Sequence, residues 1–186
     1  MKHTTKNLIH SFILVPLVAT TLSINTFTAS VGDAVSKIIA TDDSVSLQEL
    51  TLQKDREAKA AKIDAYYAQY DLPLAGHGMA MVLAAEKNGL DWRLLPAIAM
   101  RESTGGKFVC YKSFNPYGWG SCKIHFDSFE EATNTVAAHL GGNMERTARY
   151  YANKTIEQKL KAYNSVIPAY TAEMFSIMSK IEKMDA

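Results

Sequence analysis

Residues 94–120 hold a helical pattern, a glycine break and an aromatic loop in close succession. Leu95, Ile98 and Glu102 lie at i, i+3 and i+7, so the Glu102 carboxylate is in line with an apolar stripe rather than opposite it. The Thr-Gly-Gly run at residues 104–106 predicts that the helix ends just past Glu102, with glycine as its C-cap. We therefore expect an acidic side chain in the last turn of a helix, at the edge of the core.

An aromatic, glycine-rich loop follows this helix, with the sequence NPYGWG at residues 115–120. Aromatic faces bind pyranose rings, and a semi-buried acid protonates a glycosidic oxygen, so this combination is typical of a sugar-cleaving cleft. Functional residues also gather on loops that a rigid scaffold holds in place. Two alternatives stay open for Glu102, because most glutamates are exposed: a solvated residue, or a partner for Arg101.

The spacing of apolar residues, caps and glycines predicts about six helices. Capping-box spacing marks three of their starts, at Ser46 with Glu49, Ser128 with Glu131, and Thr155 with Gln158. A flexible lead is expected at residues 31–43, and the alternating residues 123–126 predict a short extended segment. The fold class is therefore mainly α, or α+β, with one irregular insertion. The predicted helices are residues 44–70, 77–88, 95–102 after a turn at 92–94, 128–140, 155–163 and 170–181.

The first 30 residues have the layout of a secretory signal. Basic residues precede an apolar run at residues 8–24, and small residues follow it at 28–30. The alternative is an uncleaved membrane anchor, but the run is about 17 residues, shorter than the roughly 20 that span a bilayer. We expect cleavage and export to the cell exterior, the cell wall or the periplasm, with no stable membrane insertion afterwards.

Composition limits the remaining classes of function. The chain has 186 residues, of which 47% are hydrophobic, and this composition predicts one globular domain. We place this domain at residues 72–186, after a signal at 1–30 and a polar helix within 31–71. The formal net charge of +1 offers no basic surface for nucleic acid. The histidines and cysteines lack metal-ligand spacing, so neither a metal nor another cofactor is expected.

Cys110 and Cys122 are the two cysteines of the chain, and they bracket the aromatic loop. In an exported chain this arrangement predicts one disulfide, which stabilises the fold by about 2 to 3 kcal/mol. A pair of buried thiols is the alternative.

Three segments together resemble bacterial peptidoglycan hydrolases of the lysozyme-like superfamily: AIAMRESTGGK, NPYGWGSCKIHFDSFEEATNTVAAHL and LKAYNSVIPAY. The resemblance covers residues 72–178. These residues are similar both to endo-β-N-acetylglucosaminidase-like domains and to soluble lytic transglycosylases. Glu102-Ser103 matches the catalytic Glu-Ser pair of these families, and Tyr163-Asn164 resembles the late Tyr-Asn pair of the transglycosylases. The Gly-Leu-Met-Gln segment of typical lytic transglycosylases is replaced by NPYGWGS.

The resemblance implies an enzyme that cleaves β-1,4 bonds between amino sugars of peptidoglycan glycan strands, with Glu102 as general acid. The oxocarbenium-like sugar is then captured by a water that a second acid activates, or by the substrate's own N-acetyl oxygen. Asp127, Glu130 and Glu131 are the candidates for the second acid. The expected substrate contacts are Ser103, Asn115, Tyr117, Trp119, Tyr151, Tyr163 and Asn164. Packing is the alternative role of the four aromatic residues.

Two other classes of function compete with the enzyme, which we expect to be a monomer. A non-catalytic peptidoglycan-binding module would keep the cleft and hold glycan without cutting it. A structural protein that self-associates through the helix at residues 46–70 is less favoured, because the polar middle of that helix lacks a sustained apolar heptad.

Overall fold

The computed structural model of the protein describes residues 25–121 and 123–185. These residues contain seven helices and no strand, which confirms the mainly α class. None of the helices in these ranges is long and apolar enough to cross a bilayer. Most of the predicted signal lies outside the described residues. The helices are α1 (Asn25–Ala68), α2 (Gly78–Lys87), α3 (Leu94–Ser103), α4 (Phe129–Gly141), α5 (Glu145–Tyr151), α6 (Ile156–Tyr163) and α7 (Tyr170–Glu182).

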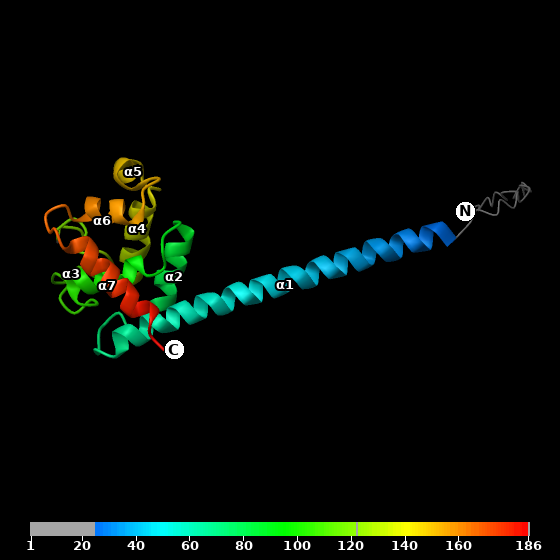
Figure 1. Cartoon of the computed structure of the whole chain (residues 1–186), viewed down its shortest axis with the longest axis horizontal. Coiled ribbons are helices and arrows are strands. Elements are labelled where there is room, and N and C mark those ends of the chain that lie inside the picture. Colours follow the sequence, from blue (N-terminus) through cyan, green and yellow to red (C-terminus); the bar gives the residue numbers. More distant parts are fainter. Residues whose placement is uncertain (1–24, 122, 186) are drawn as a thin grey trace, which may run out of the picture. The chain divides into compact units, whose positions relative to one another are not determined.

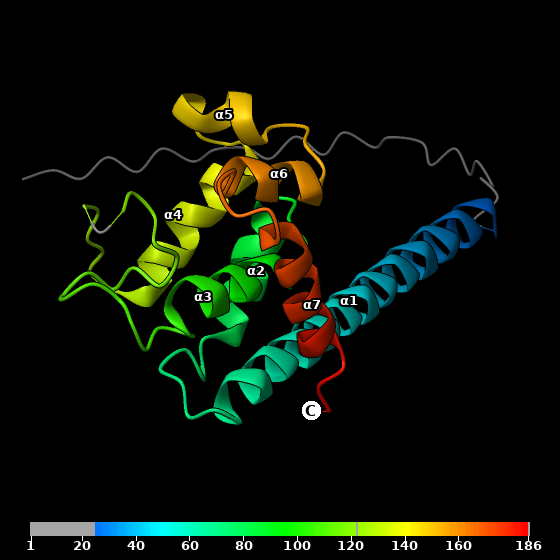
Figure 2. The ribbon, with the colours of Figure 1, turned by 60° about the vertical axis from the view of Figure 1, so that its left-hand side comes forward.

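The chain divides into two units, residues 1–46 and 47–186, and the second unit contains the candidate site. Within it, α2 packs against α4, and α3 packs against α7. Helix α5 contacts α4 and α6, and α6 also contacts α7. Figure 1 and Figure 2 show α5 and α6 together at one end of this unit and the last turns of α1 at the opposite end.

Helix α1 begins at Asn25, earlier than the start predicted at Ser44. The predicted flexible lead at residues 31–43 is therefore helical in the structure. The sequence explains this difference, because no proline interrupts residues 25–68 and the Ser46–Glu49 spacing is tolerated inside a helix. The last turns of α1 pack into the core through Ile63, Tyr66 and Tyr67, as their spacing predicts.

The junction of α1 and α2 depends on two small-scale features. A Cβ on Gly78 would lie 2.3 Å from the Ala60 carbonyl oxygen, so only glycine allows the two helices to cross this closely. Asp64 Oδ1 accepts hydrogen bonds from the Gly76 and Gly78 amides, at 2.9 and 2.8 Å. The Asp64 carboxylate thus satisfies free N–H groups at the start of α2.

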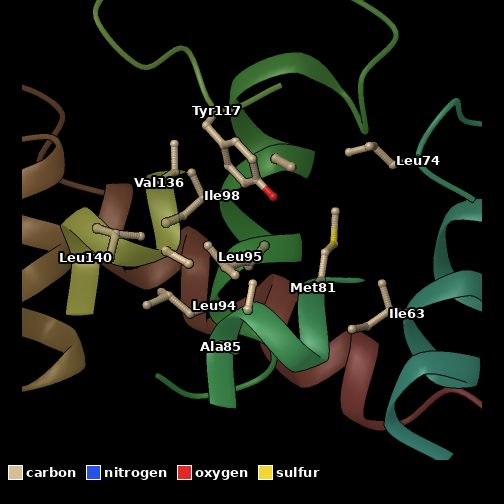
Figure 3. Close-up of a cluster of buried hydrophobic side chains, with 14 of the residues drawn as sticks. Ile63, Leu74, Met81, Ala85, Leu94, Leu95, Ile98, Tyr117, Val136 and Leu140 are labelled. Carbon is tan, nitrogen blue, oxygen red and sulfur yellow. The ribbon is translucent and has the colours of Figure 1, made fainter. Parts of the chain in front are cut away.

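Helix α3 is the centre of the core. Residues 94–99 are all buried, so this helix is covered on every side rather than along one stripe. Figure 3 shows Leu94, Leu95 and Ile98 of α3 among side chains of α2 and α4, with Tyr117 from the loop at one edge. Because its first two turns are surrounded, the position of Glu102 in the third turn is fixed by packing.

Two predicted helix starts are confirmed, one predicted extended segment is irregular, and one helix was not predicted. Ser128 and Thr155 are confirmed as helix N-caps, since each side chain accepts from the amide three residues later. The predicted extended segment at residues 123–126 is irregular, although the Phe126 amide donates to the Ser113 carbonyl at 2.8 Å. Helix α5 is an additional element that the apolar spacing does not predict.

A buried lysine joins the ends of two helices near the site. Lys159 Nζ donates to the Leu140 carbonyl of α4 and the Tyr151 carbonyl of α5, at 2.5 and 2.7 Å. An ammonium group at helix C-termini is favourable because the last carbonyls carry partial negative charge. Lys159 therefore holds α4, α5 and α6 together, although burial lowers its pKa.

Candidate active site

Helix α3 ends where the sequence predicts, one residue past Glu102. Its first left-handed residue is Thr104, with φ of 53°, rather than the glycine that the sequence analysis expected as C-cap. Gly105 is required by packing as well as by its φ of 59°, because a Cβ there would lie 2.8 Å from Leu72 Cδ1. The Gly105 amide donates to the Ala99 carbonyl and closes the helix end.

Glu102 is half-buried and accepts a hydrogen bond from a tyrosine on the last helix. The Tyr170 hydroxyl lies 2.8 Å from Glu102 Oε1. Burial raises the pKa of Tyr170, and the charge of Glu102 raises it further, so this hydroxyl remains a donor. Arg101, the alternative partner for Glu102, instead forms an ion pair with Glu173 at 2.6 Å.

The second carboxylate oxygen of Glu102 lies beneath the glycine of the aromatic loop. Gly118 has φ of 61°, and a Cβ built on it would lie 3.3 Å from Glu102 Oε2. Gly118 is exposed. Because glycine has no side chain, only the backbone of the loop lies over this oxygen. The two oxygens of Glu102 therefore differ: Oε1 is bonded to Tyr170, whereas Oε2 faces the loop.

Two of the predicted substrate contacts hold the loop from inside. The Ser103 hydroxyl lies 2.7 Å from the Pro116 carbonyl and accepts from the Gly106 amide, and only 3% of Ser103 is exposed. The Asn115 side chain bonds both the amide and the carbonyl of Trp119 and also the Ile124 carbonyl. Both side chains are thus committed to the loop backbone in this conformation.

Tyr117 also lies in the interior rather than in a cleft. Its side chain is fully buried, and its hydroxyl pairs with Thr133 Oγ1 at 2.8 Å. Its carbonyl accepts a hydrogen bond from the Tyr163 hydroxyl of α6. Tyr117 therefore anchors the loop to α4 and α6, and a sugar would not reach its ring.

Three rings extend from Glu102 along the aromatic loop, and we call them the aromatic row: Tyr170, Tyr163 and Trp119. The Tyr170 and Tyr163 rings are nearly parallel, at 12°, with centroids 6.3 Å apart. Trp119 lies 5.8 Å from Tyr163 and is partly exposed. The structure thus brings Trp119 and Tyr163, two predicted contacts, to the neighbourhood of the acid.

Tyr151 and Asn164 lie at the margins of this arrangement. The Tyr151 ring is 6.4 Å from Trp119, but only 5% of the residue is exposed. Asn164 Oδ1 accepts from the Val166 and Ile167 amides and closes the turn after α6. Asn164 also lines a groove of about 700 Å³ between α6 and α7, and Glu102 is not among the residues that line it.

Most tyrosines of the second unit are shielded from water, both in the candidate site and on α1. Burial raises the pKa of six of them, which we call the six shielded tyrosines: Tyr66, Tyr67, Tyr117, Tyr151, Tyr163 and Tyr170. Their phenol groups stay neutral at neutral pH, so the hydroxyls of Tyr163 and Tyr170 act as donors around the acid.

The candidates for a second acid lie at the start of α4. Glu131 Oε2 accepts from the Asp127 amide at 2.6 Å, so this carboxylate caps the helix. Asp127 and Glu130 are exposed.

Cys110 is disulfide-bonded, while its predicted partner Cys122 lies outside the described residues.

Sequence reasoning did not assign a site role to Tyr170 or to Gly118. Tyr170 belongs to the apolar stripe of α7 and is 1% exposed, so its spacing predicts only a core residue. Its separation from Glu102 by 68 residues hides the pairing. The positive φ of Gly118 could have been expected from its place in a glycine-rich loop, but its contact with Glu102 could not.

Comparison with protein-family models, curated proteins and solved structures finds no match to this chain. The resemblance to lysozyme-like peptidoglycan hydrolases therefore stays a prediction from the three sequence segments.

Proposed function

We propose that the chain is an exported enzyme with a lysozyme-like domain that cleaves β-1,4 bonds between amino sugars of peptidoglycan. The observation that carries this proposal is the half-buried Glu102, bonded to Tyr170 and placed beside the aromatic row. An acid near a partly exposed aromatic ring such as Trp119 is suited to protonate the leaving oxygen of a sugar that the ring binds.

The contacts of Glu102 support Oε2 as the oxygen that donates the proton. Tyr170 donates to Oε1, and an oxygen that accepts a hydrogen bond keeps a lone pair directed at the donor. In the neutral carboxyl group the proton therefore resides on Oε2, the oxygen beneath Gly118. The glycosidic oxygen approaches Oε2 along the loop backbone, where no Cβ obstructs it.

The side chains around the acid restrict the step after proton transfer. Tyr163 donates its hydroxyl to the Tyr117 carbonyl, so it offers a sugar its ring rather than a free donor. Glu131 caps α4. Capture of the oxocarbenium-like sugar by its own N-acetyl oxygen requires one protein carboxylate, whereas capture by water requires a second acid such as Asp127 or Glu130.

The experiment compares the purified chain with Glu102→Gln and with Glu145→Gln, a change of an exposed glutamate on α5. We expect the wild type and Glu145→Gln to clear a suspension of purified peptidoglycan and Glu102→Gln to leave it turbid. Clearing by Glu102→Gln at the wild-type rate would contradict the assignment of Glu102.

A non-catalytic peptidoglycan-binding module is the second candidate. It is favoured by one observation: the predicted second acids are exposed or used to cap α4. Sedimentation with insoluble peptidoglycan separates the two candidates. A binding module would co-sediment both as wild type and as Glu102→Gln, and neither protein would clear the suspension.

A further inference from the structure

His139 in the last turn of α4 packs flat against the indole of Trp119. The two ring centroids are 4.8 Å apart and the planes are inclined by 30°, which is the closest ring contact of Trp119. Trp119 is the partly exposed end of the aromatic row, on the loop that covers Glu102. The imidazole therefore covers one face of a partly exposed ring of the aromatic row.

The imidazole is itself held in one orientation by α5. His139 Nδ1 lies 2.8 Å from Thr147 Oγ1. The Thr147 hydroxyl is directed at the Met144 carbonyl, at 3.3 Å, so its single proton is used there and its oxygen accepts from Nδ1–H. This chain of bonds fixes the plane of the imidazole and leaves its face against the indole.

We propose that His139 is a positioning residue that holds the Trp119 indole as a platform for a sugar ring of the glycan. This inference rests on the proposed function, and it adds a residue that contacts neither the acid nor the substrate. A tryptophan on a glycine-rich loop has freedom to rotate, whereas one stacked on a fixed imidazole is held in one orientation. The benefit is a smaller loss of side-chain entropy when the sugar binds.

The surroundings of His139 favour a neutral imidazole. Burial lowers the pKa of His139, and the positive charge of Arg146 on α5 lowers it further. A second cation lies nearby, because Lys159 on α6 donates to the carbonyl of Leu140, the residue after His139. Tyr151 and Tyr163, the other titratable groups packed on Trp119, have raised pKa values and stay uncharged. At neutral pH the stack is therefore between two uncharged rings.

The stack is tested without substrate by tryptophan fluorescence. The chain has two tryptophans, so Trp92→Phe leaves Trp119 as the single reporter in the full chain. Protonated imidazole quenches an adjacent indole far more than neutral imidazole does. We expect fluorescence to fall as the pH decreases through the lowered pKa of His139, and to stay constant in Trp92→Phe/His139→Gln. Trp92→Phe/His125→Gln, which removes an exposed histidine, should keep the transition.

The positioning role is tested by steady-state kinetics on soluble peptidoglycan fragments. His139→Ala should raise KM about two- to tenfold with little change in kcat, the range expected for one lost ring stack. His139→Phe keeps a flat ring and should restore KM. An unchanged KM in His139→Ala, or no rescue by His139→Phe, would overturn the proposal.

The fluorescence experiment and the cleavage experiment distinguish the failure of this inference from the failure of the proposed function. A pH-dependent quench that His139→Gln removes, in a chain that does not cleave glycan, would refute the enzyme but keep the stack. Cleavage that depends on Glu102, in a chain without the quench, would keep the enzyme and refute the role of His139.

Discussion

Replacing Tyr170 with phenylalanine tests the contact on which the candidate site depends. The substitution removes the hydroxyl that donates to Glu102 Oε1 at 2.8 Å and leaves the ring. That ring is 1% exposed and stacks on Tyr163 at 6.3 Å, so phenylalanine fills the same space. Packing is therefore nearly conserved, and the measured effect reports on the hydrogen bond.

The size of the effect follows from the surroundings of the bond. A hydrogen bond to a charged group contributes about 1.5 to 3 kcal/mol. Glu102 is half-buried and water can replace part of the loss, so the lower limit applies. About 1.5 kcal/mol corresponds to a roughly tenfold decrease in kcat. We expect KM to change little, because the hydroxyl orients the acid rather than the sugar.

Tyr67→Phe is the matched control. Its hydroxyl donates to the Pro96 carbonyl at the opposite end of α3, at 2.9 Å, and the side chain is fully buried. Tyr170→Phe should lower the free energy of unfolding by about 1.5 kcal/mol and Tyr67→Phe by about 1 kcal/mol, both measured by urea denaturation. Only Tyr170→Phe should lower kcat.

A double-mutant cycle tests the contact between Tyr170 and Glu102 without any measurement of activity. The free energies of unfolding of Tyr170→Phe, Glu102→Ala and the double variant should give a coupling energy of about 0.5 to 1.5 kcal/mol. Additive losses in the cycle, or full kcat in Tyr170→Phe, would refute the reasoning that Tyr170 positions the acid.

The remaining predictions concern the glycine above the acid and the shielded tyrosines. Gly118→Ala places a Cβ 3.3 Å from Glu102 Oε2, whereas Gly89→Ala has the same φ of 61° and no atom within 4 Å. Both should lose about 1 kcal/mol of unfolding free energy because alanine is strained at positive φ, but only Gly118→Ala should also lose activity; equal activities would contradict the contact. Alkaline pH should destabilise the fold, because the six shielded tyrosines have raised pKa values in the folded state. They keep their protons above about pH 10, whereas tyrosines of the unfolded chain, with an ordinary pKa of about 10, lose them. Each fully buried tyrosine should cost about 1.4 kcal/mol per pH unit in that range, measured by urea denaturation between pH 9 and 11, and an unchanged stability would contradict the shielding.

Sequence reasoning located the helices that carry regular apolar stripes. Helices α2, α4, α6 and α7 have such stripes or capping residues, and the position of Glu102 near the end of α3 followed from local spacing. Helix α5 was missed because it has seven residues and one buried side chain, Tyr151, so it presents no stripe to detect. The start of α1 was missed because capping spacing at Ser46 indicates a possible start and not an obligatory one.

The arrangement of the site could be predicted only in part. Trp119 was expected near the acid because aromatic residues in a glycine-rich loop suggest a binding surface, and Tyr163 was expected there from the resemblance to the Tyr-Asn pair of the transglycosylases; both lie near the acid. Ser103 and Asn115 are polar, and sequence does not reveal that their partners are carbonyls of the same loop. The pairing of Tyr170 with Glu102 depends on how α7 packs against α3, which local patterns do not encode.

Mass spectrometry of the soluble fragments released from purified peptidoglycan tests the central claim most directly. The wild type and Glu145→Gln should release glycan fragments, while Glu102→Gln should release none and unfold at the same urea concentration as the wild type. The fragment ends, reducing or anhydro, would distinguish hydrolysis from the transglycosylase reaction. Equal release by Glu102→Gln and the wild type would contradict the account, because the acid that the structure holds between Tyr170 and Gly118 would then have no part in cleavage.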